Sequence, residues 1–273
     1  MSVTLLRTIV EARANIASAR ERGLTIGLVP TMGALHEGHG ALMRRAREET
    51  GYVVATIFVN PTQFDRPEDF QKYPRDLETD LAFCERLDVD AVFAPDAREM
   101  YPGEVLTTVA VAGLSTRLEG EFRPGHFRGV ATVVAKLFNI LPADRSYFGE
   151  KDAQQLAVIQ KMAADLNFPV AIVPVAIVRE PDGLAMSSRN QRLTPEQRRI
   201  APVIYKALCE AERSIQAALG MLSAVPEIQV EYFEAVDPRT FEPVEKMAGP
   251  VRIVAAVWLG DVRLIDNLLV SVR

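Results

Sequence analysis

The stretch that decides the fold is residues 25–42, "TIGLVPTMGALHEGHGAL". Its first five residues form a short, mainly apolar run that ends at a proline, which predicts a buried strand. Residues 38–49 follow with the apolar spacing of a helix. A strand therefore leads through a glycine-containing turn into a helix, which is the building unit of parallel α/β sheets.

The same alternation of short apolar runs and longer amphipathic runs extends over the first two thirds of the chain. Buried strands are predicted at "YVVATIFV" (52–59), "DAVFAP" (90–95) and "PVAIVPVAI" (169–177). Helices are predicted at residues 75–87, 127–141 and 151–166. The pattern predicts an α/β domain over residues 1–176 with a parallel sheet, whose ligands bind at the carboxyl ends of the strands.

The pattern changes near residue 176. Residues 178–199 are polar and rich in turn formers, and a helix follows them. Residues 227–237, 251–260 and 262–270 then alternate in the manner of antiparallel strands. We therefore expect a second, smaller α+β domain over residues 177–273.

Composition is that of an ordinary soluble protein, with 48% hydrophobic and 25% charged residues among 273. The net charge of −5 argues against a nucleic-acid partner. Residues 1–23 have helical spacing and lack a signal-peptide core, and no segment is long enough to span a membrane, so we expect a cytoplasmic protein. Cys84 and Cys209 lack zinc-site spacing and are expected to be buried in helices.

The turn after the first strand resembles a spoiled phosphate loop. Gly33 and Gly38 have the correct spacing, but His39 and Gly40 stand where that loop needs lysine and a hydroxyl. The spacing of His36 and His39 is also wrong for an H-E-x-x-H zinc site. A helix start attracts phosphate and disfavours imidazolium, so two neutral histidines there can donate hydrogen bonds to phosphate oxygens. The alternative is that they only cap the turn.

Two further segments carry polar side chains suited to a small anionic substrate. "EFRPGHFRGV" (121–130) holds His126, the third and last histidine, near Arg123, whose guanidinium suits carboxylate or phosphate. "FVNPTQF" (58–64) places the amides of Asn60 and Gln63 after the second strand. A solvated charged loop and a plain turn are the respective alternatives.

Two later segments suit nucleotide phosphates. "YFGEKDAQQL" (147–156) is expected to follow a strand and open a helix, and it offers a glycine for close backbone approach and Lys151 at the helix start. "MSSRN" (186–190) offers two hydroxyls and Arg189 in a polar loop, which otherwise is only a linker between domains. Together with the two histidines, these groups are typical of nucleotidyl transfer, in which the protein positions and neutralises the phosphates.

The segments "PTMGALHEGH", "FVNPTQF", "RPGHFRGV", "YFGEKDAQQ" and "MSSRNQRL" occur in this order. With these spacings the chain closely resembles the pantothenate synthetase family, the pantoate–β-alanine ligases, from about residue 25 to the end. The resemblance implies a Rossmann-like first domain, a C-terminal domain that closes over the active site, and a homodimer. It implies ATP and Mg²⁺, and two steps: pantoate and ATP form pantoyl adenylate, and β-alanine then displaces AMP.

The resemblance also assigns roles by motif position. The catalytic set is His36, His39, Lys151 and Arg189. The ATP-binding set is Met32, Gly33, Ala34, Leu35, His36, Glu37, Gly38, His39, Gly149, Glu150, Lys151, Asp152, Val178, Met186, Ser187, Ser188 and Arg189. Gln63 and Gln155 are assigned to the substrates in this way, and the residue chemistry above adds Asn60, Arg123 and His126 to the substrate-binding set. No metal ligand is assigned, and Asp80 is a candidate only from its place in the family's acidic helix.

Three departures from the family pattern stand out. Gly40 stands where many relatives have an apolar residue, and "FDRPEDF" (64–70) replaces the more usual Gly/Asn-containing loop. The segment 207–227 is shorter than the corresponding segment usually is in the family. Two other interpretations remain open at this point. One is a different adenylyl transferase with the HxGH motif, and the other is a nucleotide-binding regulator without turnover.

Overall fold

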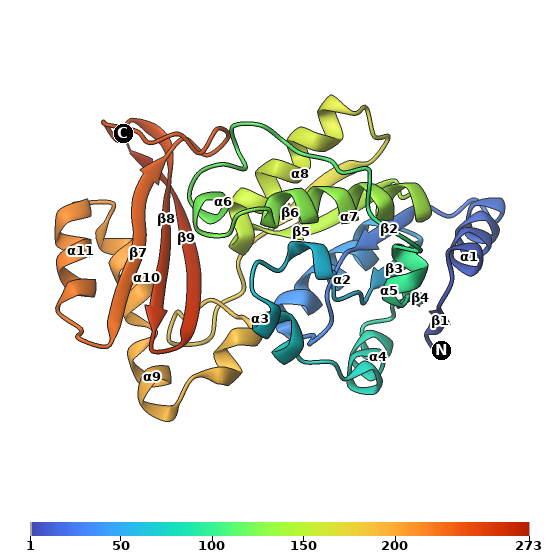
Figure 1. Ribbon diagram of the computed structural model, residues 1–273, viewed down its shortest axis with the longest axis horizontal. Helices are drawn as coiled ribbons and strands as arrows, with labels where there is room; N and C mark the ends of the chain where they lie inside the picture. Colours follow the sequence, from blue (N-terminus) through green and yellow to red (C-terminus); the bar gives the residue numbers. More distant parts are fainter. Residues whose placement is uncertain (1, 273) are drawn as a thin grey trace. The chain divides into compact units, whose positions relative to one another are not determined.

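The computed structural model describes residues 2–272 and divides into two compact units. The first comprises Met1–Glu150 and Gln155–Val175, and the second comprises Lys151–Gln154 and Ala176–Arg273. Figure 1 shows the six-stranded sheet of the first unit with its helices, and the three-stranded sheet of the second. The short segment Lys151–Gln154 groups with the second unit although its chain neighbours belong to the first.

The sheet of the first unit is entirely parallel, with strand order β1-β4-β3-β2-β5-β6. Its strands are β1 (Thr4–Leu6), β2 (Ile26–Val29), β3 (Tyr52–Thr56), β4 (Ala91–Phe93), β5 (Arg145–Gly149) and β6 (Ala171–Val175). From β2 the chain adds β3 and β4 on one side, and later adds β5 and β6 on the other. The order therefore reverses between β2 and β5, which is where open parallel sheets bind ligands.

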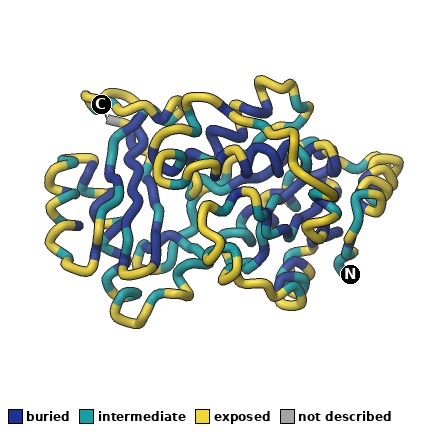
Figure 2. The backbone as a smooth tube through the Cα atoms, in the orientation of Figure 1, coloured by how far each residue is buried: buried dark blue, intermediate teal, exposed yellow. Residues whose placement is uncertain are grey.

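The strands alternate between two apolar layers, as a side-chain period of two requires. Ile26 and Leu28 of β2 face the cluster that α1, α7 and α8 complete, and Val29 faces the cluster of α2 and α4. Both layers are dark blue in the tube of Figure 2. The helices are α1 (Ile9–Glu21), α2 (Glu37–Glu49), η1 (Pro61–Gln63), α3 (Pro67–Lys72), α4 (Leu77–Arg86), α5 (Ala97–Met100), α6 (Glu119–Phe122), α7 (His126–Ile140), η2 (Glu150–Asp152) and α8 (Ala153–Asp165).

The second unit is built on an antiparallel sheet in the order β7-β8-β9. Its strands are β7 (Ile228–Val236), β8 (Gly249–Leu259) and β9 (Val262–Val272). Its helices are η3 (Ser188–Arg192), α9 (Pro195–Ile200), α10 (Val203–Glu210) and α11 (Ile215–Ser223). Ile204 and Leu208 of α10 and Leu222 of α11 pack with the strands in a separate apolar core.

The predicted fold class is confirmed, and four details differ from expectation. Residues 1–23 are not one helix, because Thr4–Leu6 pairs with β4 and Thr8 then caps α1 in a capping box. The strand expected before residue 147 is β5, and it extends further than expected, through Gly149. The C-terminal helical region forms three helices instead of one. Cys84 is buried as expected, whereas Cys209 is exposed on α10.

Candidate active site

The loop after β2 has an unusual backbone that a buried carboxylate holds in place. Gly33 and Ala34 both have positive φ, +82° and +50°. Asp80 of α4 accepts hydrogen bonds from the N–H groups of Ala34 at 3.0 Å and Leu35 at 2.8 Å. A Cβ atom at position 33 would lie 2.7 Å from Asp80 Oδ2, so glycine is needed for space as well as for φ. Burial raises the pKa of Asp80 even though the two N–H groups oppose the shift.

His36 and His39 close the start of α2 as a capping box made of two imidazoles. Nδ1 of His36 accepts the Gly38 N–H at 3.1 Å, and Nδ1 of His39 accepts the His36 N–H at 3.3 Å. The two rings lie 4.2 Å apart, centroid to centroid. Both histidines therefore cap the turn, as the alternative interpretation expected. Capping uses only their Nδ1 atoms, so the rings can still contact a ligand.

These two hydrogen bonds fix the proton positions on both rings. A nitrogen that accepts a hydrogen bond from a backbone N–H carries no proton, so each imidazole bears its proton on Nε2. Protonation of either Nδ1 would break a capping bond at the positive end of the helix dipole. In this arrangement each ring can donate a hydrogen bond from Nε2, which suits phosphate oxygens.

Asn60 lies at the centre of a buried hydrogen-bond network. Its side-chain NH₂ donates to Gln63 Oε1 at 3.1 Å and to the Gly129 carbonyl at 3.2 Å. Its Oδ1 accepts from the hydroxyls of Thr62 at 3.0 Å and Tyr101 at 2.9 Å. With the residue only 1% exposed, Asn60 orients the Gln63 amide, which also contacts Met32 through an N–H···S bond of 2.9 Å.

His126 supports the same loop from α7 and has the opposite tautomer. Its Nδ1 lies 2.8 Å from the Gln63 carbonyl, which can only accept, so Nδ1 carries the proton. Nε2 then accepts from Arg123 Nη1 at 3.2 Å. Arg123 also pairs with Asp65 at 3.3 Å and with Glu119 at 3.7 Å. These residues join α7 and the variant 64–70 loop to the backbone of Gln63.

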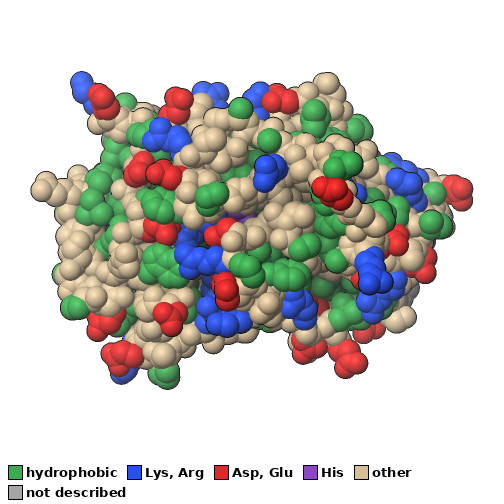
Figure 3. All heavy atoms as spheres, viewed as in Figure 1, with side chains coloured by type: hydrophobic (Ala, Val, Ile, Leu, Met, Phe, Trp, Pro, Cys, Tyr) green, Lys and Arg blue, Asp and Glu red, His purple; other side chains and the backbone are tan. Residues whose placement is uncertain are grey.

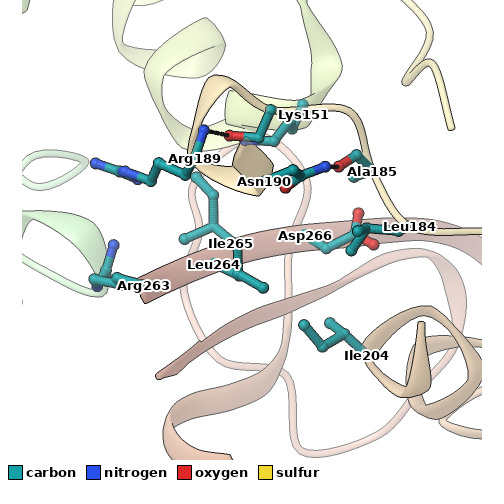
Figure 4. A pocket seen from close by; sticks show the side chains of 11 residues that line it. Lys151, Leu184, Ala185, Arg189, Asn190, Ile204, Arg263, Leu264, Ile265 and Asp266 are labelled. Atoms are coloured by element: carbon teal, nitrogen blue, oxygen red, sulfur yellow. Dashed lines mark hydrogen bonds between the residues drawn. The ribbon is translucent and has the colours of Figure 1, made fainter. Parts of the chain in front are cut away.

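The second unit has a small pocket, lined by polar and apolar side chains, that includes several predicted phosphate ligands (Figure 4). Lys151, Ser187 and Arg189 line it together with Asn190, Arg263 and Asp266. Lys151 Nζ lies 4.0 Å from the neighbouring Asp152 carboxylate, and its side chain is 19% exposed. Ser187 Oγ caps η3 by accepting the Arg189 N–H at 3.2 Å. The lining therefore combines the cationic side chains of Lys151, Arg189 and Arg263 with the Asp266 carboxylate.

The structure groups the predicted residues by unit. Residues 32–39 follow β2, and Gly149 ends the adjacent strand β5 with Glu150 directly after it, so both segments reach the same edge of the sheet. A Cβ at Gly149 would meet no atom within 4 Å, which leaves the backbone open to approach. Gln155 is half-buried on α8. In the second unit, the Val178 carbonyl accepts the Met186 N–H at 2.9 Å, and Ser188 opens η3.

Several site residues could not be found from the sequence. Tyr101 and Gly129 form hydrogen bonds with the Asn60 side chain, although they are 41 and 69 residues away from it in the sequence. Asp266 and Asn267 lie in an apolar strand pattern, where a single Asp-Asn pair is typical of a turn or a surface position. Only the polarity of this pair within β9 was available as a signal.

Among residues 2–272, no three His, Cys, Asp or Glu side chains gather in a way that could hold a metal ion. The Asp80 carboxylate, the one candidate ligand, is engaged by two backbone N–H groups. No helix within the described residues is long and apolar enough to cross a membrane. On the face drawn in Figure 3, acidic and basic side chains are interspersed, in keeping with the absence of a basic footprint in the sequence.

Comparison with known proteins identifies the family of this chain. The model of the family described as Pantoate-beta-alanine ligase matches residues 4–269. The pantothenate synthetase of Moorella thermoacetica is 52% identical, over 98% of this chain and 99% of that protein. The crystal structure of pantothenate synthetase from Thermus thermophilus has a TM-score of 0.93 at 47% identity, covering 97% of this chain and 99% of that one.

A third relative is a ligand complex. Pantoate-beta-alanine ligase from Francisella tularensis, complexed with β,γ-ATP and β-alanine, has a TM-score of 0.86 at 36% identity. The alignment covers 98% of this chain and 97% of that one. A match of this extent, to the family model and to relatives in sequence and structure, excludes both a different adenylyl transferase and a regulator as the family of this protein. The chain belongs to the pantoate–β-alanine ligase family of enzymes.

Proposed function

We propose that this ligase condenses pantoate with β-alanine through a pantoyl-adenylate intermediate. In the first step a pantoate carboxylate oxygen attacks the α-phosphorus of ATP, and the bond to the leaving pyrophosphate breaks. In the second step the β-alanine amine attacks the acyl carbon, AMP leaves, and the amine loses a proton. The observation that carries the proposal is the pair of neutral histidines at the start of α2, at the switch point of the sheet.

The proposed ATP site begins at residues 32–39. The Nε2–H groups of His36 and His39 are assigned to phosphate oxygens whose negative charge grows as the α-phosphorus is attacked. The helix dipole of α2 adds to this stabilisation. Gly149 and Glu150, at the end of the neighbouring strand, are assigned to ATP through the backbone. Because the rings are held by backbone bonds before ATP arrives, little reorganisation is needed during the reaction.

Gln63 and Gln155 are the proposed ligands of pantoate, with Gln63 shared by β-alanine. The contacts of Asn60, Arg123 and His126 support a change in their assigned roles. Each is engaged within the protein, through the Gln63 side chain, the Asp65 carboxylate and the Gln63 carbonyl respectively. We therefore propose that they position Gln63 and do not bind substrate directly.

The residues of the second unit are proposed to complete the phosphate site. Lys151 and Arg189 would neutralise charge on the phosphates, and Met186, Ser187 and Ser188 would contact the nucleotide when this unit closes on bound ATP.

Mg²⁺ is proposed to arrive with ATP and to be held by phosphate oxygens and water, since the described residues offer no ligand cage. The homodimer remains a prediction that rests on the family resemblance, and the cytoplasmic location remains a prediction that rests on the sequence pattern.

An isotope experiment tests the intermediate. Pantoate labelled with ¹⁸O in its carboxylate is incubated with ATP, Mg²⁺ and β-alanine, and the products are analysed by mass spectrometry. An adenylate pathway transfers one ¹⁸O to AMP, because that oxygen bridges the acyl carbon and phosphorus. Formation of ADP with label in phosphate would instead indicate an acyl phosphate and would refute the proposal. AMP formation without any need for pantoate would refute the assignment of the acid substrate.

A further inference from the structure

Strand β9 carries two adjacent polar residues that are almost completely buried. Asp266 is 6% exposed and Asn267 is 3% exposed, in the middle of the apolar run "VRLIDNLLV". Buried polar groups are costly unless they are satisfied by partners, so the contacts of this pair call for a reason. Both residues lie in the second unit, and Asp266 lines the same pocket as Lys151 and Arg189 (Figure 4).

Asp266 anchors the segment that leads to the Ser-Ser-Arg loop. Arg179 donates two hydrogen bonds to its carboxylate, of 2.6 and 3.0 Å. The same guanidinium donates to the Gly183 carbonyl at 3.1 Å and lies 3.9 Å from the Tyr205 ring centroid. Since Arg179 is bridged to Ala185, this contact fixes the base of the turn that precedes Met186.

Asn267 anchors the other cationic segment of the pocket. Its side-chain Nδ2 donates to the backbone carbonyl of Lys151 at 3.0 Å. Its Oδ1 accepts a hydrogen bond from Arg252, which can only donate, so the amide cannot turn round. Its own carbonyl accepts from Arg179 at 3.2 Å, and its N–H donates to Asp266 Oδ1 at 2.7 Å. The two anchors are thus one connected network.

We propose that Asn267 is a positioning residue that holds Lys151 in register with the Met186–Arg189 segment, and that Asp266 is its counterpart on that segment. The inference rests on the proposed function, in which Lys151 acts on ATP phosphates. Lys151 lies in η2, directly after β5 and Glu150, and the Asn267 amide holds its backbone from 116 residues away. A displacement of about 1 Å in a group that contacts the transition state can cost ~100-fold in rate.

The test compares three variants of the full-length enzyme. Asn267→Asp keeps an acceptor for Arg252 but replaces the donor to Lys151 by an oxygen. Asn267→Ser removes the contact without adding charge. Ser271→Asp is the matched control, because Ser271 is an exposed residue of the same strand and lies outside the network. We expect both Asn267 variants to lower kcat between ~10- and ~100-fold with KM for pantoate changed less than about threefold, and the control to behave as wild type.

A double-mutant cycle separates positioning from general loss of structure. If Asn267 acts through Lys151, Asn267→Asp should lower kcat little further once Lys151→Met has removed the ammonium group. An equal fold-change in the wild-type and Lys151→Met backgrounds would overturn the proposal, as would wild-type kcat in both Asn267 variants.

Hydrogen exchange distinguishes this inference from the proposed function. Loss of the anchor should speed amide exchange across residues 148–154 in both Asn267 variants and not in Ser271→Asp, whatever the substrate is. Unchanged exchange in that segment overturns the inference. Failure of the wild-type enzyme to form AMP from pantoate and ATP would instead overturn the proposed function.

Discussion

At the scale of single residues, His39 carries two functions on two ring nitrogens, and substitutions can separate them. Asparagine places an acceptor near the position of Nδ1 but has nothing at Nε2. Asn at position 39 should therefore retain the cap on the His36 N–H and lose the donor to phosphate. We predict that the free energy of unfolding of His39→Asn lies within about 1 kcal/mol of the wild-type value. The rate of adenylate formation should fall ~10²- to 10³-fold. Pyrophosphate release and thermal unfolding measure the two effects.

His39→Gln serves as the matched control, because its amide reaches toward the Nε2 position. It should retain more activity than His39→Asn and lose more stability. The opposite order, or equal activity in the two variants, would show that the Nε2–H donor is not the catalytic group.

Asp80 is a second residue for which we propose a structural role. Both carboxylate oxygens hold the 34–35 backbone, so Asp80→Asn turns an amide NH₂ toward a backbone N–H. We predict a loss of about 1–3 kcal/mol in the free energy of unfolding and a higher KM for ATP. The Mg²⁺ concentration that gives half-maximal rate, measured at saturating ATP, should stay as in wild type. A marked increase in the Mg²⁺ requirement without loss of stability would restore Asp80 as a metal ligand.

What the sequence predicted at this scale depends on how far apart partners lie in the chain. The histidine pair at the helix start was predictable, because His36, Gly38 and His39 are neighbours and a capping box is a local device. The role of Asn60 was not, because Tyr101 and Gly129 reach it only through the tertiary fold. Exposure of Cys209 was likewise hidden, since a helical pattern does not state which face packs.

At the scale of elements, the contact of α7 with η1 controls the position of Gln63. A Cβ at Gly129 would lie 2.2 Å from the Thr62 carbonyl oxygen and 2.7 Å from Gln63 Cα. Gly129→Ala must therefore push the two elements apart. We predict a loss of about 1–3 kcal/mol in unfolding free energy and a fall of ~10- to 100-fold in kcat/KM for pantoate, measured by chemical denaturation and steady-state kinetics.

The control for this substitution is Gly220→Ala in α11, where a Cβ meets no atom within 4 Å. Alanine is the better helix former by about 1 kcal/mol, so this variant should be as stable as wild type or more so. Wild-type pantoate kinetics in Gly129→Ala would show that Gln63 does not depend on this helix contact.

Element boundaries show why pattern alone was incomplete. Strand β1 is three residues long and was absorbed into the following helical pattern, although Thr8 is a good N-cap that marks the true helix start. Strand β5 begins with Arg145, whose side chain pairs with Glu49 at 2.9 Å at the end of α2. Both strands form because neighbours in the sheet are available, which is information that no local window contains.

At the scale of the whole molecule, the two units have separate cores, and each unit holds a side chain whose signal can report the unfolding of that unit. Cys84 is buried in the first unit, and burial together with the nearby Asp80 charge raises the pKa of its thiol to about 12. Trp258, the single tryptophan of the chain, lies on β8 of the second unit. In Cys209→Ser, thiol labelling therefore reports the first unit and fluorescence reports the second. Without ligand we predict unfolding transitions with different midpoints.

Ligand should bring these two transitions together if the proposed site uses residues of both units. A ligand that binds only the folded state stabilises it by RT ln(1 + [L]/Kd), which is about 2.7 kcal/mol at 100 times Kd. A nonhydrolysable ATP analogue with Mg²⁺ and pantoate should therefore raise the Cys84 and the Trp258 midpoints together. Lys151→Met should reduce the shift at both probes, whereas Ser271→Asp should not. If the ligands move only the Cys84 transition, the second unit contributes no binding free energy, and the roles proposed for Lys151 and Arg189 are wrong.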